Sequence, residues 1–145
     1  MSTNTKSRFS FFAGALLTLS SIAYAGSPHH NTDSATADPT VTSLMTQSLP
    51  GLPGKEGLVI LVDYPPGASD PVHRHDASAF VYVLEGSIVM QVEGGKEVTL
   101  TPGQTFYEGP NDIHTVGRNA SQTRPARFLA VLIKNQGAPA LIPVK

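Results

Sequence analysis

With 145 residues, 40% of them hydrophobic, and a formal charge of −1, the chain has the size and composition of one globular domain. The near-neutral charge argues against a nucleic-acid-binding protein, since most of those carry a strongly basic face, and we expect no nucleic-acid partner. The sequence contains no cysteine, which excludes disulfides and leaves stability to the core, aided at most by a metal.

The N-terminus has the pattern of a secretory signal peptide over residues 1–25. Lys6 and Arg8 precede a short apolar stretch, and the small residues of Ala-Tyr-Ala end at Ala25. This order predicts cleavage after Ala25 and export to the periplasm or to the outside of a bacterial cell. An uncleaved membrane anchor is the alternative, but the apolar stretch is short for a spanning helix. We therefore expect no stable membrane insertion after cleavage.

Residues 26–40 are small and polar and show no periodicity, which predicts a flexible lead-in. His29 and His30 lie in this segment. Two neighbouring histidines near a mature N-terminus can capture copper or zinc weakly, but solvated side chains in a flexible tail are the simpler interpretation.

Residues 41–145 have the pattern of a single all-β domain. Short β-branched segments alternate with Gly- and Pro-rich turns about every ten residues, which indicates an antiparallel sandwich or barrel. Residues 42–48 are the one candidate for a short helix. The expected strands and their turns are 57–67, 79–86, 87–95, 96–104, 105–112, 113–119 and 125–134.

The histidines of this domain form a candidate metal site. His73 and His75 are two residues apart, and side chains with that spacing on a strand point to the same face. His114, the third histidine of the domain, follows about 40 residues later, and antiparallel folding can bring it to the same place. Three neutral imidazoles suit Fe, Mn, Zn, Ni or Cu, and the ligand type alone does not choose among them.

The residues around His73 resemble the first motif of the cupin family. That motif has a glycine, five residues, His-x-His, three or four residues, a glutamate, six residues and a glycine. Here Gly67, His73, His75 and Gly86 fit every spacing, but Ala79 stands where the family has its glutamate.

The second cupin motif is present in a less regular form. It has a glycine, five to seven residues, Pro-x-Gly, two residues, a histidine, three residues and an asparagine. Gly103 and His114 match, whereas Gly109, Asn111 and Arg118 replace the proline, the second glycine and the asparagine. The resemblance covers about residues 57–134.

The resemblance implies an antiparallel double-stranded β-helix with one divalent metal inside the barrel. His73, His75 and His114 would be ligands, and the glutamate missing at Ala79 would leave a neutral three-histidine set, as in some cupin dioxygenases. Glu108 is a replacement candidate, because it lies six residues before His114 and strand parity can place both on one face. A solvated carboxylate at a strand end is the alternative for Glu108. Two weaker neutral candidates are Gln91 and Gln104.

The family includes enzymes of many reaction types as well as non-catalytic proteins, so resemblance alone does not fix the function. We expect either a metal-dependent oxygenase acting on a small chelating organic molecule, or a module that binds a metal or small ligand without turnover. No catalytic side chain is assigned. The resemblance also implies a possible homodimer, because small cupins often dimerise through sheet edges. The expected cavity-lining residues are Phe80, Tyr82, Met90 and Phe106.

Overall fold

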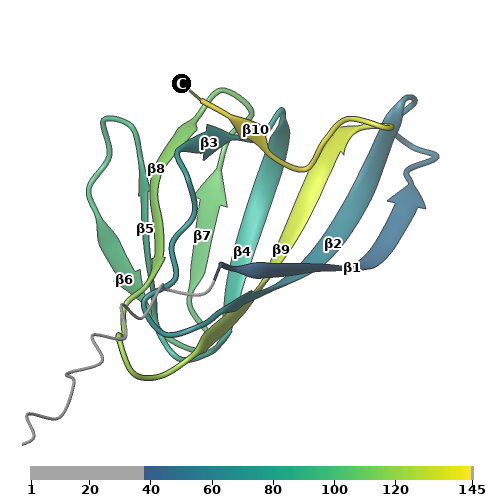
Figure 1. The fold of residues 1–145 in the computed structure, drawn as a ribbon. Helices are drawn as coiled ribbons and strands as arrows, with labels where there is room; N and C mark the ends of the chain where they lie inside the picture. Colours follow the sequence, from purple (N-terminus) through teal and green to yellow (C-terminus); the bar gives the residue numbers. More distant parts are fainter. Residues whose placement is uncertain (1–37, 145) are drawn as a thin grey trace, which may run out of the picture. The chain divides into compact units, whose positions relative to one another are not determined.

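The computed structural model describes residues 38–144, which form two antiparallel sheets of five strands each (Figure 1). Those residues contain no helix, which confirms the all-β fold class. The first sheet has the order β1 (Thr40–Ser48), β2 (Lys55–Tyr64), β9 (Ala126–Asn135), β4 (Ala77–Glu85) and β7 (Thr105–Glu108). The second sheet has the order β10 (Ile142–Pro143), β3 (His73–Arg74), β8 (Ile113–Asn119), β5 (Ile88–Val92) and β6 (Val98–Leu100).

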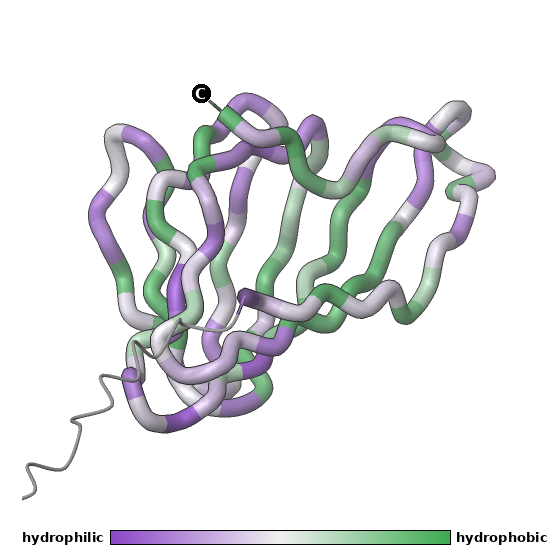
Figure 2. Tube along the Cα trace, viewed as in Figure 1, coloured by the Kyte–Doolittle hydropathy of each residue, from purple (hydrophilic) through white to green (hydrophobic). Residues whose placement is uncertain are grey.

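Apolar side chains at alternate positions of the long strands form the core between the sheets. On β4, for example, Ala77, Ala79, Val81 and Val83 are buried, while the residues between them are not. Because the side chains of a strand alternate between its two faces, one face of each strand packs inward and the other turns outward. Figure 2 shows the hydrophobic residues gathered along β2, β9 and β4.

The turn between β4 and β5 requires the glycine that ends the first motif. Gly86 has a φ of 69°, which glycine adopts without strain. A Cβ at this position would lie 2.4 Å from the carbonyl oxygen of Pro125. Gly86 therefore allows the chain to cross from the first sheet to the second in close contact with the residue before β9.

The expectation of a short helix over residues 42–48 was wrong, because this segment lies within β1 and pairs with β2, with Thr42 opposite Leu61 and Ser48 opposite Glu56. All nine residues of β1 are exposed. An edge strand held by backbone hydrogen bonds, with neither face in the core, shows no hydrophobic alternation in its sequence. β1 also begins at Thr40, one residue inside the expected lead-in.

The expected signal peptide and most of the expected lead-in, including His29 and His30, lie outside the described residues. Within residues 38–144 there is no helix of the length and apolarity needed to cross a membrane.

Candidate metal centre

Three histidines and one carboxylate, carried on or next to strands of both sheets, lie close together between the sheets. His73 on β3 and His114 on β8 are direct register partners, and His75 follows two residues after His73. Glu108 ends β7 in the other sheet. One potential ligand atom from each of these four side chains lies within 4.8 Å of the others. We refer to His73, His75, Glu108 and His114 as the four-ligand cluster.

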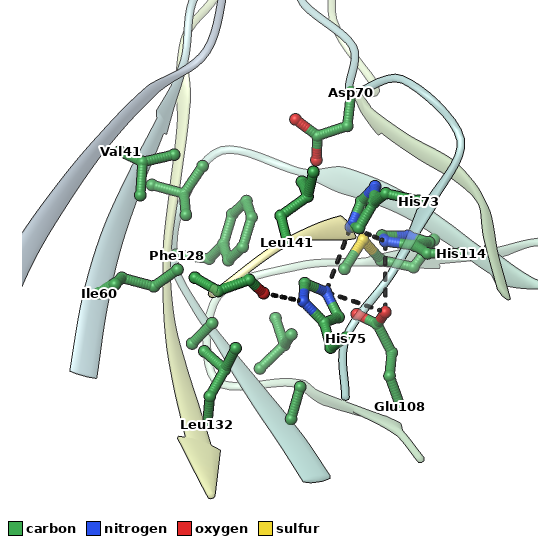
Figure 3. Close-up of a pocket in the computed structure, with 16 residues that line it drawn as sticks. Val41, Ile60, Asp70, His73, His75, Glu108, His114, Phe128, Leu132 and Leu141 are labelled. Atoms are coloured by element: carbon green, nitrogen blue, oxygen red, sulfur yellow. Dashed lines mark hydrogen bonds and ion pairs between the residues drawn. The ribbon is translucent and has the colours of Figure 1, made fainter. Parts of the chain in front are cut away.

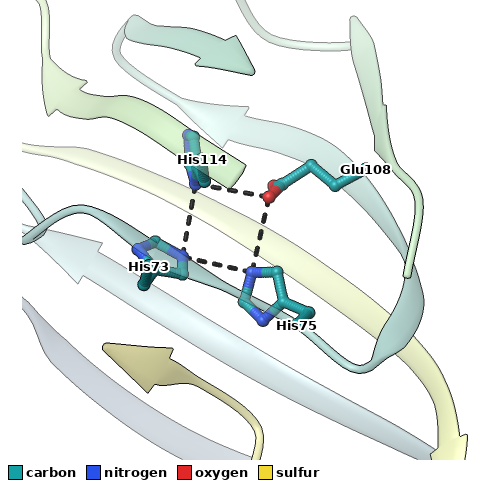
Figure 4. Close-up of side chains that lie close together, drawn as sticks. All are labelled: His73, His75, Glu108 and His114. Atoms are coloured by element: carbon teal, nitrogen blue, oxygen red, sulfur yellow. Dashed lines mark hydrogen bonds and ion pairs between the residues drawn. The ribbon is translucent and has the colours of Figure 1, made fainter. Parts of the chain in front are cut away.

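The potential ligand atoms form a closed ring around a common centre (Figure 4). The Nε2 atom of His73 lies 3.2 Å from Nε2 of His75 and 3.3 Å from Nδ1 of His114. The Oε2 atom of Glu108 lies 3.4 Å from Nε2 of His75 and 3.3 Å from Nδ1 of His114. Ligands bound about 2.1 Å from one metal ion lie about 3.0–3.4 Å from their neighbours, so the observed spacing matches that of a metal site.

Two of the histidines are oriented by backbone carbonyl groups. Nδ1 of His73 is 2.8 Å from the carbonyl oxygen of Pro71, and Nδ1 of His75 is 2.5 Å from that of Ala140. With Nδ1–H donating to these carbonyls, each Nε2 is left unprotonated and faces the centre of the cluster. Such an outer partner fixes both the tautomer and the ring orientation of a metal-ligating histidine.

Burial of the cluster leaves polar atoms that need a further partner. His73, Glu108 and His114 are each 2% exposed. Oε2 of Glu108 makes no hydrogen bond of good geometry within the described residues, and neither does Nε2 of His114. An unpaired buried carboxylate oxygen is costly, and a cation between Glu108 and the imidazoles would remove that cost. The donor set therefore fits a divalent metal.

The charges of the cluster also fit metal ligation. Burial lowers the pKa of His73, which favours its neutral form. Burial alone would lower the pKa of His75, but the carboxylate of Glu108 and the carbonyl of Ala140 outweigh it and raise that pKa. Burial would raise the pKa of Glu108, but His75 and His114 outweigh it and hold that pKa below 4.5. Glu108 is thus an ionised carboxylate, the form that binds metals.

Position 79 faces the cluster although it carries no ligand. Ala79 is 1% exposed and is the direct partner of Glu108 in the pairing of β4 with β7. A methyl side chain there leaves room for the carboxylate of Glu108. The two weaker neutral candidates lie elsewhere: Gln91 donates to the carbonyl of Gly95, and Gln104 accepts a hydrogen bond from the backbone of Thr101.

The cluster forms one end of a cavity of about 90 Å³ between the sheets. Apolar side chains from β1, β2 and β9, including Val41, Ile60, Phe128 and Leu132, line the opposite side (Figure 3). Ala140 and Leu141, from the segment before β10, also line the cavity. The arrangement suits a small ligand with a metal-binding end and an apolar remainder.

The expectation that Phe80 and Tyr82 line the cavity was wrong. They are 51% and 46% exposed and do not line it. Since Ala79 points inward, strand alternation turns its neighbour Phe80 outward, and Tyr82 with it. Met90 does line the cavity, whereas Phe106 is partly buried and packs against the core without lining it.

The sequence analysis missed most of the apolar cavity wall and its one polar residue outside the cluster, Asp70. Asp70 lies three residues before His73, in a loop where its capping tendency explains an aspartate without any functional role. In the structure its carboxylate lines the cavity and accepts a hydrogen bond from the hydroxyl of Tyr64. No local pattern marks Asp70, because the contact depends on how β2 packs beneath the loop.

Comparison with known proteins agrees with this architecture. The cupin domain profile matches residues 60–132. The chain is 32% identical over 85 residues to the cupin-domain-containing oxidoreductase fogC of Aspergillus ruber, covering 58% of this chain and 42% of that protein. The matched part of this chain therefore spans less than half the length of that relative.

Solved structures share the fold at low sequence identity. An uncharacterized conserved protein with a double-stranded β-helix domain from Klebsiella pneumoniae superposes with a TM-score of 0.59 at 17% identity, over 76% of this chain and 89% of that one. Oxalate oxidase in complex with the substrate analogue glycolate gives a TM-score of 0.57 at 22% identity, over 79% and 58% of the two chains. The double-stranded β-helix expected from the sequence is thereby confirmed.

Proposed function

The chain belongs to the cupin family, and from this premise we propose that it is a metal-dependent oxidoreductase acting on a small organic molecule that chelates the metal. The observation that carries the proposal is the buried four-ligand cluster at one end of a 90 Å³ cavity. More specifically, we propose that the protein is an oxygenase. The relative from Aspergillus ruber, named as an oxidoreductase, supports the reaction class.

The cluster would hold one divalent transition metal. Three imidazoles and one carboxylate suit Fe, Mn, Zn, Ni and Cu, and oxygenase chemistry would require a redox-active member of that set. A bound metal would supply Lewis-acid or redox chemistry at the cavity wall. With Glu108 ionised, a divalent metal and its four ligands together carry one positive charge, which attracts anionic or oxygen-rich ligands.

The residues around the centre offer little other chemistry. All three histidines of the described chain belong to the cluster, so no imidazole among residues 38–144 remains to serve as a separate general base. The polypeptide's own contribution is to hold the ligands, exclude water with apolar walls, and limit the ligand's size. A cavity of 90 Å³ is far smaller than the roughly 300–1,000 Å³ of drug-sized sites, which restricts the substrate to a few heavy atoms.

Oxygen uptake tests the proposal. The tag-free protein is loaded separately with Fe(II), Mn(II) and Cu(II) and assayed with a panel of small hydroxy acids, dicarboxylates, diketones and thiols. We expect one metal and one substrate class to give uptake that disappears after chelation and returns on reloading. His75→Ala should abolish it.

Two other results have defined meanings. A protein that holds its metal but turns over nothing in the panel would be the metal-binding or ligand-binding module that is the alternative function. Uptake that persists in His75→Ala would come from free metal, and the oxidoreductase proposal would be rejected.

We further propose that the protein is exported. Lys6, Arg8, the apolar stretch after them and the small residues ending at Ala25 support cleavage at that point. Mass spectrometry of the protein from the native cell envelope should find Gly26 as the first residue. A chain that retains Met1 and remains in the cytoplasm would contradict the proposal.

A further inference from the structure

We propose that Asp70 is a substrate-binding residue, whose carboxylate accepts a hydrogen bond from a hydroxyl or amino group of the small molecule bound at the four-ligand cluster. This inference rests on the proposed function and narrows its substrate class. It assigns a role to a partly buried carboxylate that the metal site itself does not use.

The loop and its neighbours hold Asp70 in one position. Its backbone N–H donates to the carbonyl of Gly117 at 2.8 Å, and its Oδ2 accepts a hydrogen bond from the hydroxyl of Tyr64. No hydrogen bond within residues 38–144 reaches the other carboxylate oxygen, Oδ1. Asp70 lines the cavity beside the cluster (Figure 3), so that Oδ1 is an acceptor available to a ligand.

Tyr64 is a rigid support for this carboxylate. Its side chain is fully buried and packs edge-on against Phe128, with ring centroids 5.2 Å apart. The buried amide of Asn119 donates to the carbonyl of Tyr64 at 3.2 Å and fixes the end of β2. Burial and the charge of Asp70 raise the pKa of Tyr64, so its hydroxyl keeps its proton and donates to Oδ2.

Gly117 shows how closely these groups approach the metal ligands. A Cβ at Gly117 would lie 2.9 Å from Cε1 of His114, 3.0 Å from Oδ2 of Asp70 and 3.1 Å from the hydroxyl oxygen of Tyr64. A metal ligand, the carboxylate and its support therefore converge on one point, where the absence of a side chain leaves room for all three. A molecule of a few atoms bound at the cluster lies within reach of Asp70.

The chemistry of the other walls assigns the ligand class. Apart from the cluster, every side chain that lines the cavity except Asp70 is apolar. A hydroxyl or amino group brought into such a cavity must find an acceptor or lose its hydration uncompensated. The substrate class that uses both polar features is a short-chain acid with a hydroxyl or amino group next to its carboxylate.

Binding of two probes of equal shape tests the inference. Zn(II)-loaded protein is titrated calorimetrically with 2-hydroxypropanoate and with 2-methylpropanoate, which differ by a hydroxyl in place of a methyl group. The wild type should prefer the hydroxy acid. A hydrogen bond to a charged acceptor changes affinity by roughly 10–100-fold, so Asp70→Asn and Asp70→Leu should each reduce that preference by at least tenfold. Because these variants keep the metal, the loss of preference measures the contribution of Asp70 separately from any preference that arises at the metal.

Zinc content and circular dichroism of each variant provide the controls. Tyr64→Phe, which keeps the carboxylate but removes its support, should retain zinc and lose part of the preference. A preference that is unchanged in Asp70→Asn with zinc retained would overturn the inference and make the Asp70–Tyr64 pair purely structural. Absence of any preference in the wild type would overturn it too. A wild type that loads no zinc or other metal would overturn the proposed function first, and the inference with it.

Discussion

Ala79 and Glu108 are direct partners on the adjacent strands β4 and β7, and both face the same buried centre. The family motif places its carboxylate at position 79, whereas this chain places one directly across the strand pair. Glu108 on β7 therefore brings a carboxylate to the part of the barrel that a glutamate at position 79 on β4 would occupy. Because the residue at position 79 is small, Glu108 has room to approach the histidines.

This relationship predicts that the carboxylate can be moved back. Glu108→Ala should lower metal affinity by more than the roughly 10–100-fold lost with an outer-shell partner, since it removes a ligand. The double variant Ala79→Glu/Glu108→Ala should recover a large part of the loss, because it restores one carboxylate to the same centre. Competition with a chelator of known affinity measures both.

A surface carboxylate provides the matched control for lost charge. Glu97 pairs with Arg118 at an exposed site, so Glu97→Gln should leave metal affinity unchanged. If Glu108→Ala binds metal as tightly as the wild type, Glu108 is not a ligand and the site is a three-histidine one.

Metal affinity should fall as the pH decreases, and His75 should set where the fall begins. The pKa of His75 is raised above 6.5, so the metal-free protein still holds this proton at pH values where an ordinary histidine has lost it. A metal must displace it, which weakens binding by up to about tenfold per pH unit below that pKa. Titration from pH 8 to pH 5 at fixed ionic strength measures the midpoint.

Glu108→Gln tests the cause of the raised pKa. This change removes the charge that outweighs burial at His75, so the midpoint of the pH dependence should move to lower pH, even though affinity is weaker throughout. A midpoint that does not move would mean that Glu108 does not control the protonation of His75.

Gly117→Ala should destabilise the protein and disturb the metal site together. The new methyl group would lie within 3.1 Å of His114, Asp70 and Tyr64, and overpacking of this kind costs about 1–3 kcal/mol. Thermal unfolding of the metal-free protein should show a Tm lower by several degrees.

Gly57→Ala is the matched control on β2. A Cβ there would meet its nearest neighbour, Cδ1 of Ile133, at an ordinary contact distance of 3.8 Å. Its Tm should therefore stay close to that of the wild type. Equal effects of the two glycine substitutions would show that backbone changes, not crowding at the site, determine the loss.

The C-terminal segment should contribute to metal affinity through His75. The carbonyl of Ala140 accepts from His75, Lys134 donates to the carbonyl of Ala138, and β10 pairs with β3. Ending the chain at Gly137 should weaken metal binding by about 10–100-fold, the usual effect of losing a partner of a ligating histidine. Chelator competition measures the affinity, and circular dichroism verifies that the barrel persists. An intact affinity would show that this segment does not orient His75.

The sequence predicted the parts of this protein that depend on local pattern. Strand alternation and turn residues predicted the long strands other than β1, and the spacing of His73 and His75 predicted the candidate site. Those signals failed where tertiary packing determines the position of a residue. Exposed β1 has no alternation to detect, and Asp70 is held at the cavity by contacts with Tyr64 on β2 and Gly117 on β8 that no local pattern reveals. Phe80 could have been placed correctly, since Ala79 was already expected to face the site.

Metal stoichiometry of the tag-free protein, before and after chelation, tests the central claim most directly. The account predicts a ratio near one metal per chain, which collapses in His73→Ala and in His114→Ala while the β-rich circular dichroism spectrum is retained. Metal that binds only the native state should also increase the free energy of unfolding, by about 2.7 kcal/mol at a hundredfold excess over Kd. This increase should raise the Tm. Metal content that survives in His114→Ala but disappears when His29 and His30 are replaced would contradict the account and assign binding to the N-terminal histidines.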